Sequence, residues 1–512
     1  MTDVILAKLD NEEAEYRLAP PFGILYLADA LEKAGFDVEL FHEIGTEADI
    51  EALLELVSAA APLFVGFSTM TGPSLLPTMR ASRRIKERLP VTIVWGGLHP
   101  TMLPEQTLAN DFVDIVAIGE GEQTVVELAR ALREGGAEAG ALSRIAGIAF
   151  KRDGRGQGHS FGIVRNEPRA FIQEIDDLHP AWHRVEIDRY FRSSKHFYTD
   201  LGSQFRGKKI AAVLTSRGCP WRCAFCYNQF VNKRTFRSQS PQRVVEDIRD
   251  YQDRYGITAL IFEDDCFFTN RARALEIVRQ IDLPWTCSIR ANYLVKWGDD
   301  FVAELKRCNC VELRIGAESG SQRVLDIMQK DITPEQILAA ARLCQKHGIK
   351  ASLGFMVGIP GESWPDVLQT LDLMDALEAL GEGVAVIGPC IFTPYPGTPL
   401  FEEAIKLGFE APASLQEWGG RLWDHKQPLA PYVDRRIRFI GYYRRLARRR
   451  DLDQLAFALP TRVLSQVAGL RWRHRFFRFP LDYTVPAAGL DVLARLGLGD
   501  ARDRLRQAAW KS

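Results

Sequence analysis

The sequence predicts an α/β protein with two sets of parallel strands and a mainly helical C-terminal region. Residues 1–150 and 207–407 both alternate short apolar runs with amphipathic segments of helical length. Strands that alternate with helices in this way form parallel sheets whose faces are covered by helices. Because 512 residues are too many for one hydrophobic core, we expect separate domains. The turn-rich residues 151–206 are expected to link them.

The composition is that of an ordinary globular protein, with 46% hydrophobic residues, 26% charged residues and a formal net charge of −1. We find no secretion signal and no apolar run of the length that spans a bilayer. The nine cysteines are an odd number, which favours a reducing compartment over a framework of disulfides. We therefore expect a cytoplasmic protein.

Residues 1–150 contain five predicted strands, and in a doubly wound sheet the ligand lies beyond the carboxyl ends of the strands. Small and polar residues follow the third, fourth and fifth strands at this edge. They are Ser68, Thr69 and Met70, then Gly96, Gly97, Leu98 and His99, and finally Gly119, Glu120 and Gly121. Glycines at strand ends let the backbone approach a ligand closely.

Residues 207–407 contain six predicted strand–helix units, which indicates a partial (β/α)6 barrel rather than a closed barrel of eight strands. The first strand, Ile210–Leu214, is followed by Cys219, Cys223 and Cys226. Three thiolates can bind three irons of a cubane cluster and leave the fourth iron open. The alternatives are a zinc site and three structural thiols. Zinc favours four ligands, and the sequence has no second C-x-x-C pair to supply them.

The spacing C-x3-C-x2-C, with an aromatic residue before the last cysteine, resembles the signature of the radical S-adenosylmethionine (SAM) superfamily. This resemblance implies a [4Fe–4S] cluster and SAM, which is cleaved to a 5′-deoxyadenosyl radical. It also implies SAM contacts at the strand ends, at Phe225, Tyr227, Glu263, Asp264, Asp265, Arg290, Glu318, Ser319, Gly358 and Pro394. A solvated acidic loop at residues 263–265 and aromatic residues that pack in a core loop are the structural alternatives.

The strand-end residues of the first 150 residues resemble those of cobalamin-binding domains, which have a flavodoxin-like (Rossmann-type) sheet. The match is Ser68 to Met70 after the third strand and Gly96-Gly97 after the fourth. The histidine motif that follows the first strand in many such domains is missing from residues 9–18, as in the radical SAM branch of the group. The resemblance implies cobalamin contacts at the ten residues named above for this edge. An isolated His99 also fits a structural role in its loop, and a degenerate sheet kept as a scaffold is the alternative for the domain.

The last region is basic, with 21 Lys and Arg against 12 Asp and Glu from Phe401 to the end. Arginines alternate with aromatic residues between Arg471 and Phe479. Such a surface can contact a membrane or an anionic substrate, or the aromatic residues can pack on the barrel while the arginines stay solvated. We expect helices at residues 435–449 and 500–510.

Together, these resemblances imply a cobalamin-binding domain at 1–150, a linker at 151–206, a radical SAM core at 207–407 and a helical region at 408–512. The implied function is methylation of an unactivated carbon of a small-molecule biosynthetic intermediate, with methylcobalamin as the methyl donor. A cyclase or ring-rearranging enzyme with the same cofactors is the first alternative, and a non-catalytic cobalamin or redox sensor is the second. We expect a small-molecule substrate and an external reductant such as flavodoxin or ferredoxin, and no nucleic acid. The sequence identifies no catalytic residue.

Overall fold

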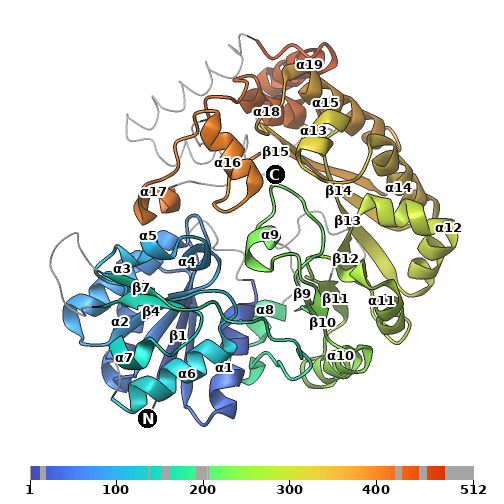
Figure 1. Ribbon diagram of the computed structural model, residues 1–512. Coiled ribbons are helices and arrows are strands. Elements are labelled where there is room, and N and C mark those ends of the chain that lie inside the picture. The colour runs from blue at the N-terminus through green and yellow to red at the C-terminus, as the bar shows by residue number, and fades with distance from the viewer. Residues whose placement is uncertain are drawn as a thin grey trace.

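The computed structural model describes residues 2–11, 19–135, 139–152, 162–191, 205, 207–420, 429–448 and 458–478. In these residues the chain forms two large sheets, one in each half of the molecule, and one small two-stranded sheet between them (Figure 1). The α/β class and the two-sheet architecture predicted from the sequence are confirmed.

The first sheet has the strand order β2-β1-β3-β4-β5-β6-β7. Its strands are β1 (Val4–Leu9), β2 (Val38–Glu43), β3 (Phe64–Ser68), β4 (Thr92–Gly96), β5 (Ile115–Ala117), β6 (Ile148–Lys151) and β7 (Ile163–Arg165). The first five are parallel, in the order of a flavodoxin-like sheet, and β6 and β7 continue it as antiparallel strands. Buried apolar residues make up most of β1, β3 and β4, as is typical of parallel strands with both faces covered.

Helices cover both faces of this sheet. They are α1 (Phe22–Lys33), α2 (Glu47–Ala60), α3 (Leu75–Arg88), α4 (Leu98–Met102), α5 (Pro104–Leu108), α6 (Glu122–Arg133) and α7 (Ala139–Leu142). Helices α1 and α6 share one hydrophobic core with the sheet, and α2 and α3 share the other. A capping box, in which the Thr46 side chain and the Asp49 carboxylate each accept a backbone N–H bond, begins α2.

The second sheet contains six parallel strands in the order β15-β14-β13-β12-β11-β8. They are β8 (Ile210–Val213), β11 (Ala259–Phe262), β12 (Trp285–Ile289), β13 (Cys310–Glu318), β14 (Lys350–Val357) and β15 (Val384–Ile391). The two edge strands, β8 and β15, do not pair with each other, so the sheet is the partial barrel that the sequence predicts. The small antiparallel pair β9 (Ser216–Arg217) and β10 (Arg237–Ser238) follows β8, with the short helix α9 (Asn228–Val231) between them.

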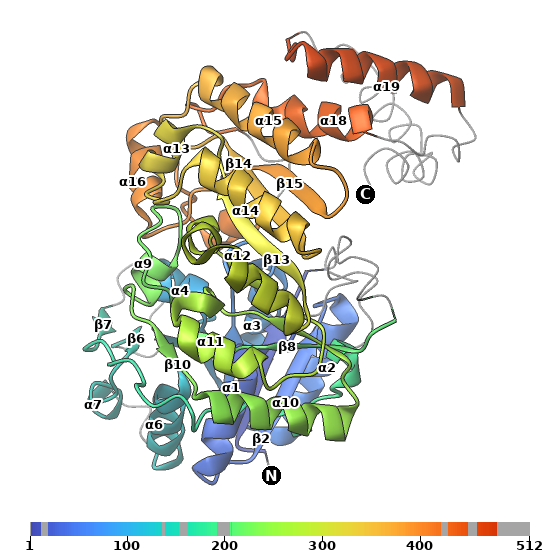
Figure 2. The same ribbon diagram turned by 90° about the vertical axis from the view of Figure 1, so that its right-hand side faces the viewer.

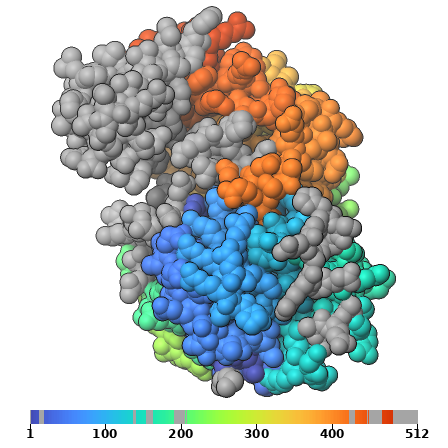
Figure 3. Space-filling view, turned by 90° about the vertical axis from the view of Figure 1, so that its left-hand side faces the viewer, coloured from blue at the N-terminus to red at the C-terminus, as the bar shows by residue number. Residues whose placement is uncertain are grey.

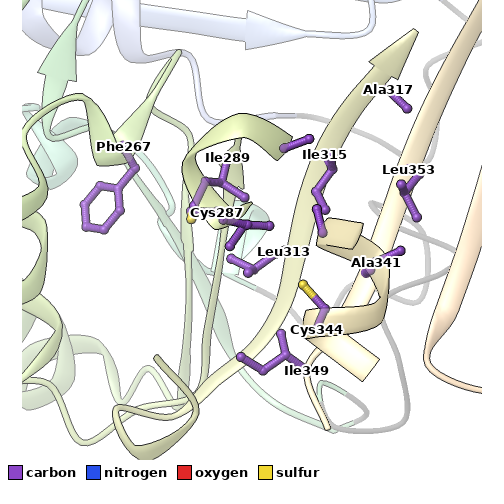
Figure 4. Packing of buried hydrophobic residues seen from close by; sticks show 14 of the residues in the cluster. Phe267, Cys287, Ile289, Leu313, Ile315, Ala317, Ala341, Cys344, Ile349 and Leu353 are labelled. Carbon is purple, nitrogen blue, oxygen red and sulfur yellow. The ribbon is translucent and has the colours of Figure 1, made fainter. Parts of the chain in front are cut away.

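The helices of the barrel cover its outer side, onto which Figure 2 looks. They are α10 (Pro241–Tyr255), α11 (Arg271–Val278), α12 (Ala291–Arg307), α13 (Gln322–Ile327), α14 (Pro334–Lys346) and α15 (Trp364–Glu378), whereas α16 (Pro399–Lys406) follows β15 and packs against the cysteine loop. The two-residue period of β13 decides which side chains they cover. Leu313, Ile315 and Ala317 belong to the core shared with α14, shown in Figure 4. The alternate residues, among them Glu312 and Arg314, line the inner side of the sheet.

The segment expected to be a linker is partly built into both halves. Strand β7 pairs with β6, so the first sheet continues past the boundary expected at residue 150. After it come η2 (Trp182–Arg184) and α8 (Asp188–Phe191). The Trp182 side chain packs in the barrel core with Leu25 of α1, and its Nε1 donates a hydrogen bond to the Tyr251 hydroxyl at 3.0 Å. Because the segment is polar overall, its composition did not indicate that residues such as Trp182 hold the two sheets together.

The C-terminal region contains α17 (Leu415–Gly420), α18 (Ile437–Arg448) and α19 (Ala458–Arg473). Helix α17 packs on α3, and Figure 3 shows this orange segment lying against the blue first half. Trp472 and Phe477 are buried against the barrel, whereas Phe476 is exposed. The helix predicted at residues 500–510 lies outside the described residues. In the described part of the chain, no helix is both long and apolar enough to cross a membrane.

Candidate active site

The three cysteines of the signature line one cavity of about 540 Å³ inside the partial barrel. The loop that carries them is held by two backbone hydrogen bonds at Ala224. Its N–H donates to the Met328 carbonyl at 2.8 Å, and its carbonyl accepts from the Leu400 N–H at 3.0 Å. Because both anchors lie more than 100 residues further along the chain, the positions of the cysteines depend on the complete fold of the barrel.

The donor set of this cavity fits an iron–sulfur cluster. Cys219, Cys223 and Cys226 present three soft sulfur ligands, and burial raises the pKa of the Cys226 thiol to about 11. Metal binding would displace that proton. Among the described residues, no three His, Cys, Asp or Glu side chains are placed to hold a single metal ion. In a cluster each thiolate binds a different iron, so the three sulfurs need not converge on one point. The three cysteines therefore fit a cluster better than a single zinc ion.

The acidic residues 263–265 divide into three different environments. Asp265 lines the cavity and accepts a hydrogen bond from the Tyr227 hydroxyl at 2.9 Å. Glu263 forms an ion pair with Arg314 at 3.4 Å. Asp264 does not line the cavity, and the solvated acidic loop that we considered is absent from this position, because Asp264 is buried.

Asp264 holds the start of the cysteine loop. Its Oδ1 accepts hydrogen bonds from the Thr215 N–H at 3.2 Å, from the Thr215 hydroxyl at 2.9 Å and from the Ser216 hydroxyl. Burial raises the pKa of this carboxyl to about 6, although these bonds and Arg273 oppose the change. We therefore correct its expected role from a SAM contact to a support of the loop.

Besides Asp264 and Glu263, four other expected SAM contacts do not line the cavity. Ser319 is fully buried, and its hydroxyl lies 2.9 Å from the Thr370 hydroxyl of α15. The Glu318 carboxylate accepts a hydrogen bond from the Lys330 ammonium at 2.7 Å, and it is Lys330 that lines the cavity. The remaining two, Gly358 and Pro394, do not line it either.

Within the glycine-rich strand β14 and the turn after it, Gly354 rather than Gly358 faces the cavity. A Cβ built on Gly354 would meet no atom within 4 Å, so this residue leaves open space beside the cysteines. A Cβ on Gly358 would instead meet Val433 of the C-terminal region at 3.3 Å. Of the two expected aromatic contacts, Phe225 lines the cavity, while Tyr227 reaches its edge through Asp265.

Arg290 lines the cavity, but its guanidinium is directed at the cysteine loop. Nη1 lies 3.4 Å from the Cys223 sulfur, and the guanidinium carbon lies 3.8 Å from the centre of the Trp221 ring. Cys266, which follows the acidic residues, also lines the cavity and shares a hydrogen bond with Cys219. Sequence reasoning missed Trp221, Cys266 and Lys330. For Cys266, its position directly after a strand-end acidic run was a usable signal.

A second cavity, of about 260 Å³, lies at the carboxyl edge of the first sheet. Six of the ten expected cobalamin contacts line it, namely Ser68, Gly96, Gly97, Gly119, Glu120 and Gly121. Gly97 has a φ of +95°, and a Cβ there would lie 2.6 Å from the Thr69 carbonyl oxygen. Glycine is therefore required at this position, and the part of the wall formed by the glycines is bare backbone. Such a wall fits the close approach of a large, flat ligand such as cobalamin.

The other four expected cobalamin contacts do not line this cavity. Thr69 is buried and donates its N–H to the Gly96 carbonyl at 2.9 Å, whereas Met70 is 46% exposed. Leu98 begins α4, which contacts α9 of the cysteine loop. His99 is fully buried, with Nδ1 3.0 Å from the Thr71 hydroxyl and its ring against Trp418 of α17.

The burial and contacts of His99 are those that the structural alternative predicts. Burial lowers its pKa to about 4, so the ring is neutral at physiological pH. His42, the other histidine near this edge, is hydrogen-bonded to Asp10 and Tyr190 and does not line the cavity either. Among the described residues, no histidine lines the second cavity, in line with the missing histidine motif.

An ionic network joins the two cavities. The Glu120 carboxylate accepts hydrogen bonds from Arg237 at 2.7 and 2.9 Å and from Arg217 at 3.1 Å, and Arg217 also pairs with Glu122. Burial alone would lower the pKa of Arg217, but the nearby carboxylates of Glu122 and Glu120 have the larger combined effect and raise this pKa. Arg217 lies two residues before Cys219 and lines the second cavity together with Leu214. The wall of one cavity thus continues into the loop of the other.

Comparisons with known proteins match both halves. The family model described as the radical SAM superfamily matches residues 213–374, and that of the B12 binding domain matches residues 15–129. An uncharacterized methyltransferase of Pyrococcus horikoshii is 31% identical over 396 residues, which cover 75% of this chain and 78% of the relative. The anaerobic magnesium-protoporphyrin IX monomethyl ester cyclase of Cereibacter sphaeroides is 27% identical over 75% of this chain, but only 60% of the cyclase is covered.

Among solved structures, the radical SAM methyltransferase TsrM of Kitasatospora setae has the same fold. Its TM-score is 0.62 at 21% identity, over 79% of this chain and 76% of TsrM. The fold and the cysteine cavity define an enzyme that uses SAM at an iron–sulfur cluster. The chain belongs to the cobalamin-dependent radical SAM family, and its cofactors are a [4Fe–4S] cluster, SAM and cobalamin.

Proposed function

We propose that this enzyme transfers a methyl group to a carbon atom of a small-molecule substrate. The observation that carries the proposal is that one segment of the chain, residues 214–226, contributes to the lining of both cavities. Arg217 and Leu214 line the cavity of the first sheet, and Cys219, two residues after Arg217, lines the cavity of the barrel. When bound there, SAM and cobalamin supply hydrogen abstraction and the methyl group, and two cofactors held side by side can act on one carbon.

We assign the residues of the barrel cavity as follows. Cys219, Cys223 and Cys226 hold the cluster. Asp265, oriented by the Tyr227 hydroxyl, accepts a hydrogen bond from the amino group of SAM, and Phe225 packs beside its adenine ring. Trp221 and Ile387 also line this cavity, and we assign to them the exclusion of water from the reacting carbon.

In the first sheet we assign the cobalamin contacts to the residues that line its cavity. Gly96, Gly97, Gly119 and Gly121 allow the ligand to approach the backbone, and the Ser68 hydroxyl offers it a hydrogen bond. Glu120 lines the cavity, but its carboxylate is bound by Arg217 and Arg237, so we assign it to holding the two domains together. The domain limits at residues 150, 206 and 407 remain proposals.

Methyl transfer is favoured by the relative of highest identity described above, which is named as a methyltransferase, and by TsrM, whose structure was solved with a tryptophan substrate. The second candidate is ring formation without net methyl transfer, because the relative from Cereibacter sphaeroides is named as a cyclase. We do not favour the sensor alternative, since both relatives are named as enzymes.

The partners expected from the sequence remain proposals. They are a small-molecule substrate and an external reductant, and we expect no nucleic acid. Contact with a membrane through the basic C-terminal region is also a proposal. It draws on Leu470 and Phe476, which are exposed beside Arg471 and Arg473. A reducing compartment agrees with the nine cysteines, all of which are free thiols.

The test is anaerobic reconstitution with iron, sulfide and cobalamin, then incubation with a chemical reductant, a small-molecule extract and SAM carrying a deuterated methyl group, followed by mass spectrometry of the products. Methyl transfer predicts S-adenosylhomocysteine, 5′-deoxyadenosine and a substrate that gains the label. Cyclisation predicts 5′-deoxyadenosine with no label in the product. Cys226→Ala should form none of these products, while the exposed Cys390→Ala should behave like the wild type. Formation of 5′-deoxyadenosine by Cys226→Ala would contradict the cluster assignment.

A further inference from the structure

Arg290 is a buried cation that lacks a carboxylate partner. Its side chain follows β12 at the start of α12, and the residue is 7% exposed. Across the ranges that the structure describes, it forms no ion pair within 4 Å of an Asp or Glu oxygen. A buried charge is costly unless an opposite charge compensates it. We therefore expect a negatively charged group to lie beside the Arg290 guanidinium when the site is occupied.

Three other cations around the cysteine loop differ from Arg290 in this respect. Lys330 pairs with Glu318 at 2.7 Å, Arg222 with Asp331 at 3.0 Å, and Arg314 with Glu263 at 3.4 Å. Each of these three charges is therefore neutralised locally. Arg290 is the exception among them, although it is at least as deeply buried as the rest.

The orientation of the guanidinium is fixed by contacts on every side. Nη2 donates to the Lys330 carbonyl, Nε donates to Asn292 Oδ1 at 3.3 Å, and the planar group stacks on the Trp221 ring at 3.8 Å. These contacts leave Nη1 directed at the Cys223 sulfur, 3.4 Å away. An arginine placed to bind the carboxylate of SAM would instead have two adjacent N–H groups that face the open part of the cavity.

We propose that Arg290 donates a hydrogen bond to the Cys223 sulfur of the bound cluster and raises the reduction potential of that cluster. The proposal rests on the assignment of Cys223 as a cluster ligand. A cluster held by three thiolates becomes more negative when it accepts an electron, so a fixed positive charge beside one thiolate stabilises the reduced form. Hydrogen bonds to ligand sulfurs act in the same direction. Arg290 is thus a positioning and tuning residue.

This role differs from the one that the sequence suggested for Arg290, which was to bind a carboxylate. The two roles predict different results in the absence of SAM. A residue that tunes the cluster changes its potential whether or not SAM is bound, whereas a SAM ligand changes only the affinity for SAM. The distinguishing measurement therefore needs the cluster alone and does not require turnover.

The experiment is a redox titration of the reconstituted, SAM-free protein, followed by electron paramagnetic resonance of the reduced cluster. Arg290→Met should make cluster reduction about tenfold less favourable, a fall of about 59 mV for a one-electron couple. Arg290→Lys keeps the charge but loses the planar fork, so its shift should be smaller and in the same direction. The matched control is Arg222→Met, which removes an exposed, already paired guanidinium from the same loop and should leave the potential unchanged.

An unchanged potential in Arg290→Met, together with weaker SAM binding in equilibrium dialysis, would show that Arg290 is a SAM ligand and would overturn the proposal. If Arg290→Met does not retain iron, the reduction potential of the Arg290→Lys cluster is the deciding measurement. A wild-type potential in that variant would also overturn the proposal. The redox titration does not depend on turnover, so its result holds even if the enzyme transfers no methyl group. Retention of a normal cluster by Cys223→Ala would instead show that the ligand assignment is at fault.

Discussion

The ionic network between the two cavities offers a quantitative test through Glu120→Gln. The Glu120 carboxylate is bound by Arg237, whose side chain is only 5% exposed, and by Arg217. It also accepts a hydrogen bond from the Ile172 N–H at 2.8 Å. The substitution keeps the size of the side chain and one oxygen acceptor but removes the charge. Arg217 retains Glu122, whereas Arg237 has no second carboxylate among the described residues.

Removing one partner of a buried ion pair costs about 3–5 kcal/mol, and the retained oxygen acceptor places Glu120→Gln near the lower limit, at about 3 kcal/mol. For a domain of 150–250 residues, each kcal/mol lowers the melting temperature by roughly 2–4 °C. We therefore expect the unfolding transition of the first domain to fall by about 6–12 °C. Cobalamin retention should weaken as well, because the Gly119–Gly121 turn lines the second cavity.

Differential scanning calorimetry of the apoprotein measures the transition directly. The matched control is Glu105→Gln in the same domain, whose partner Arg165 lies 3.3 Å away and whose side chain is 58% exposed. An exposed pair contributes less than about 1 kcal/mol, so the control should shift the transition by only a few degrees. Equal shifts in the two variants would refute the claim that the network holds the cavities in place.

Three further substitutions test individual residues. Gly97→Ala puts a methyl group 2.6 Å from the Thr69 carbonyl oxygen at a φ of +95°, so cobalamin retention in equilibrium dialysis should fall about tenfold or more. His99→Gln should leave cobalamin retention unchanged. Since burial lowers the pKa of His99 to about 4, the wild type should lose about 3 kcal/mol of stability as the pH falls from 6.5 to 4, and the variant should not. Asp264→Asn keeps the hydrogen bonds to the cysteine loop. Because burial raises the pKa of Asp264 to about 6, its ionisation costs the wild type on the order of 3 kcal/mol as the pH rises from 4 to 6, and the variant should escape this loss.

The control for Gly97→Ala comes from the same domain. Gly135→Ala introduces a similar backbone strain, at a φ of +82°, but Gly135 does not line the second cavity and its Cβ would meet no atom within 4 Å, so cobalamin retention should survive. Loss of cobalamin from His99→Gln would restore this residue as a ligand contact. For Asp264, urea unfolding between pH 4 and 6 is the measurement, and parallel stability curves for variant and wild type would contradict the buried, protonated carboxyl.

The architecture was predictable because it depends on features that are local in the sequence. Apolar runs of strand length alternate with amphipathic helices, and this alternation alone favours parallel sheets. The cysteine loop was recognisable because three ligands lie within eight residues of one another. The hairpin of β6 and β7 was not predicted, since β7 has only three residues and follows a turn-rich stretch.

The direction of side chains at strand ends could not be predicted, because it depends on contacts that are distant in sequence. Asp264 and Asp265 are neighbours, yet one supports Thr215 and the other faces the cavity. His99 turns toward Trp418, which lies in a different region of the chain. Spacing along the sequence therefore identified the edges of the two sheets but not which residues at those edges face a ligand.

The central claim is that three cysteines hold a cluster with one iron left open for SAM. The most direct measurement is the electron paramagnetic resonance spectrum of the reduced, reconstituted protein before and after SAM is added. An open iron predicts a changed spectrum, because SAM becomes a ligand of that iron. A spectrum that SAM does not alter, or a protein that retains zinc in place of the cluster, would contradict the claim.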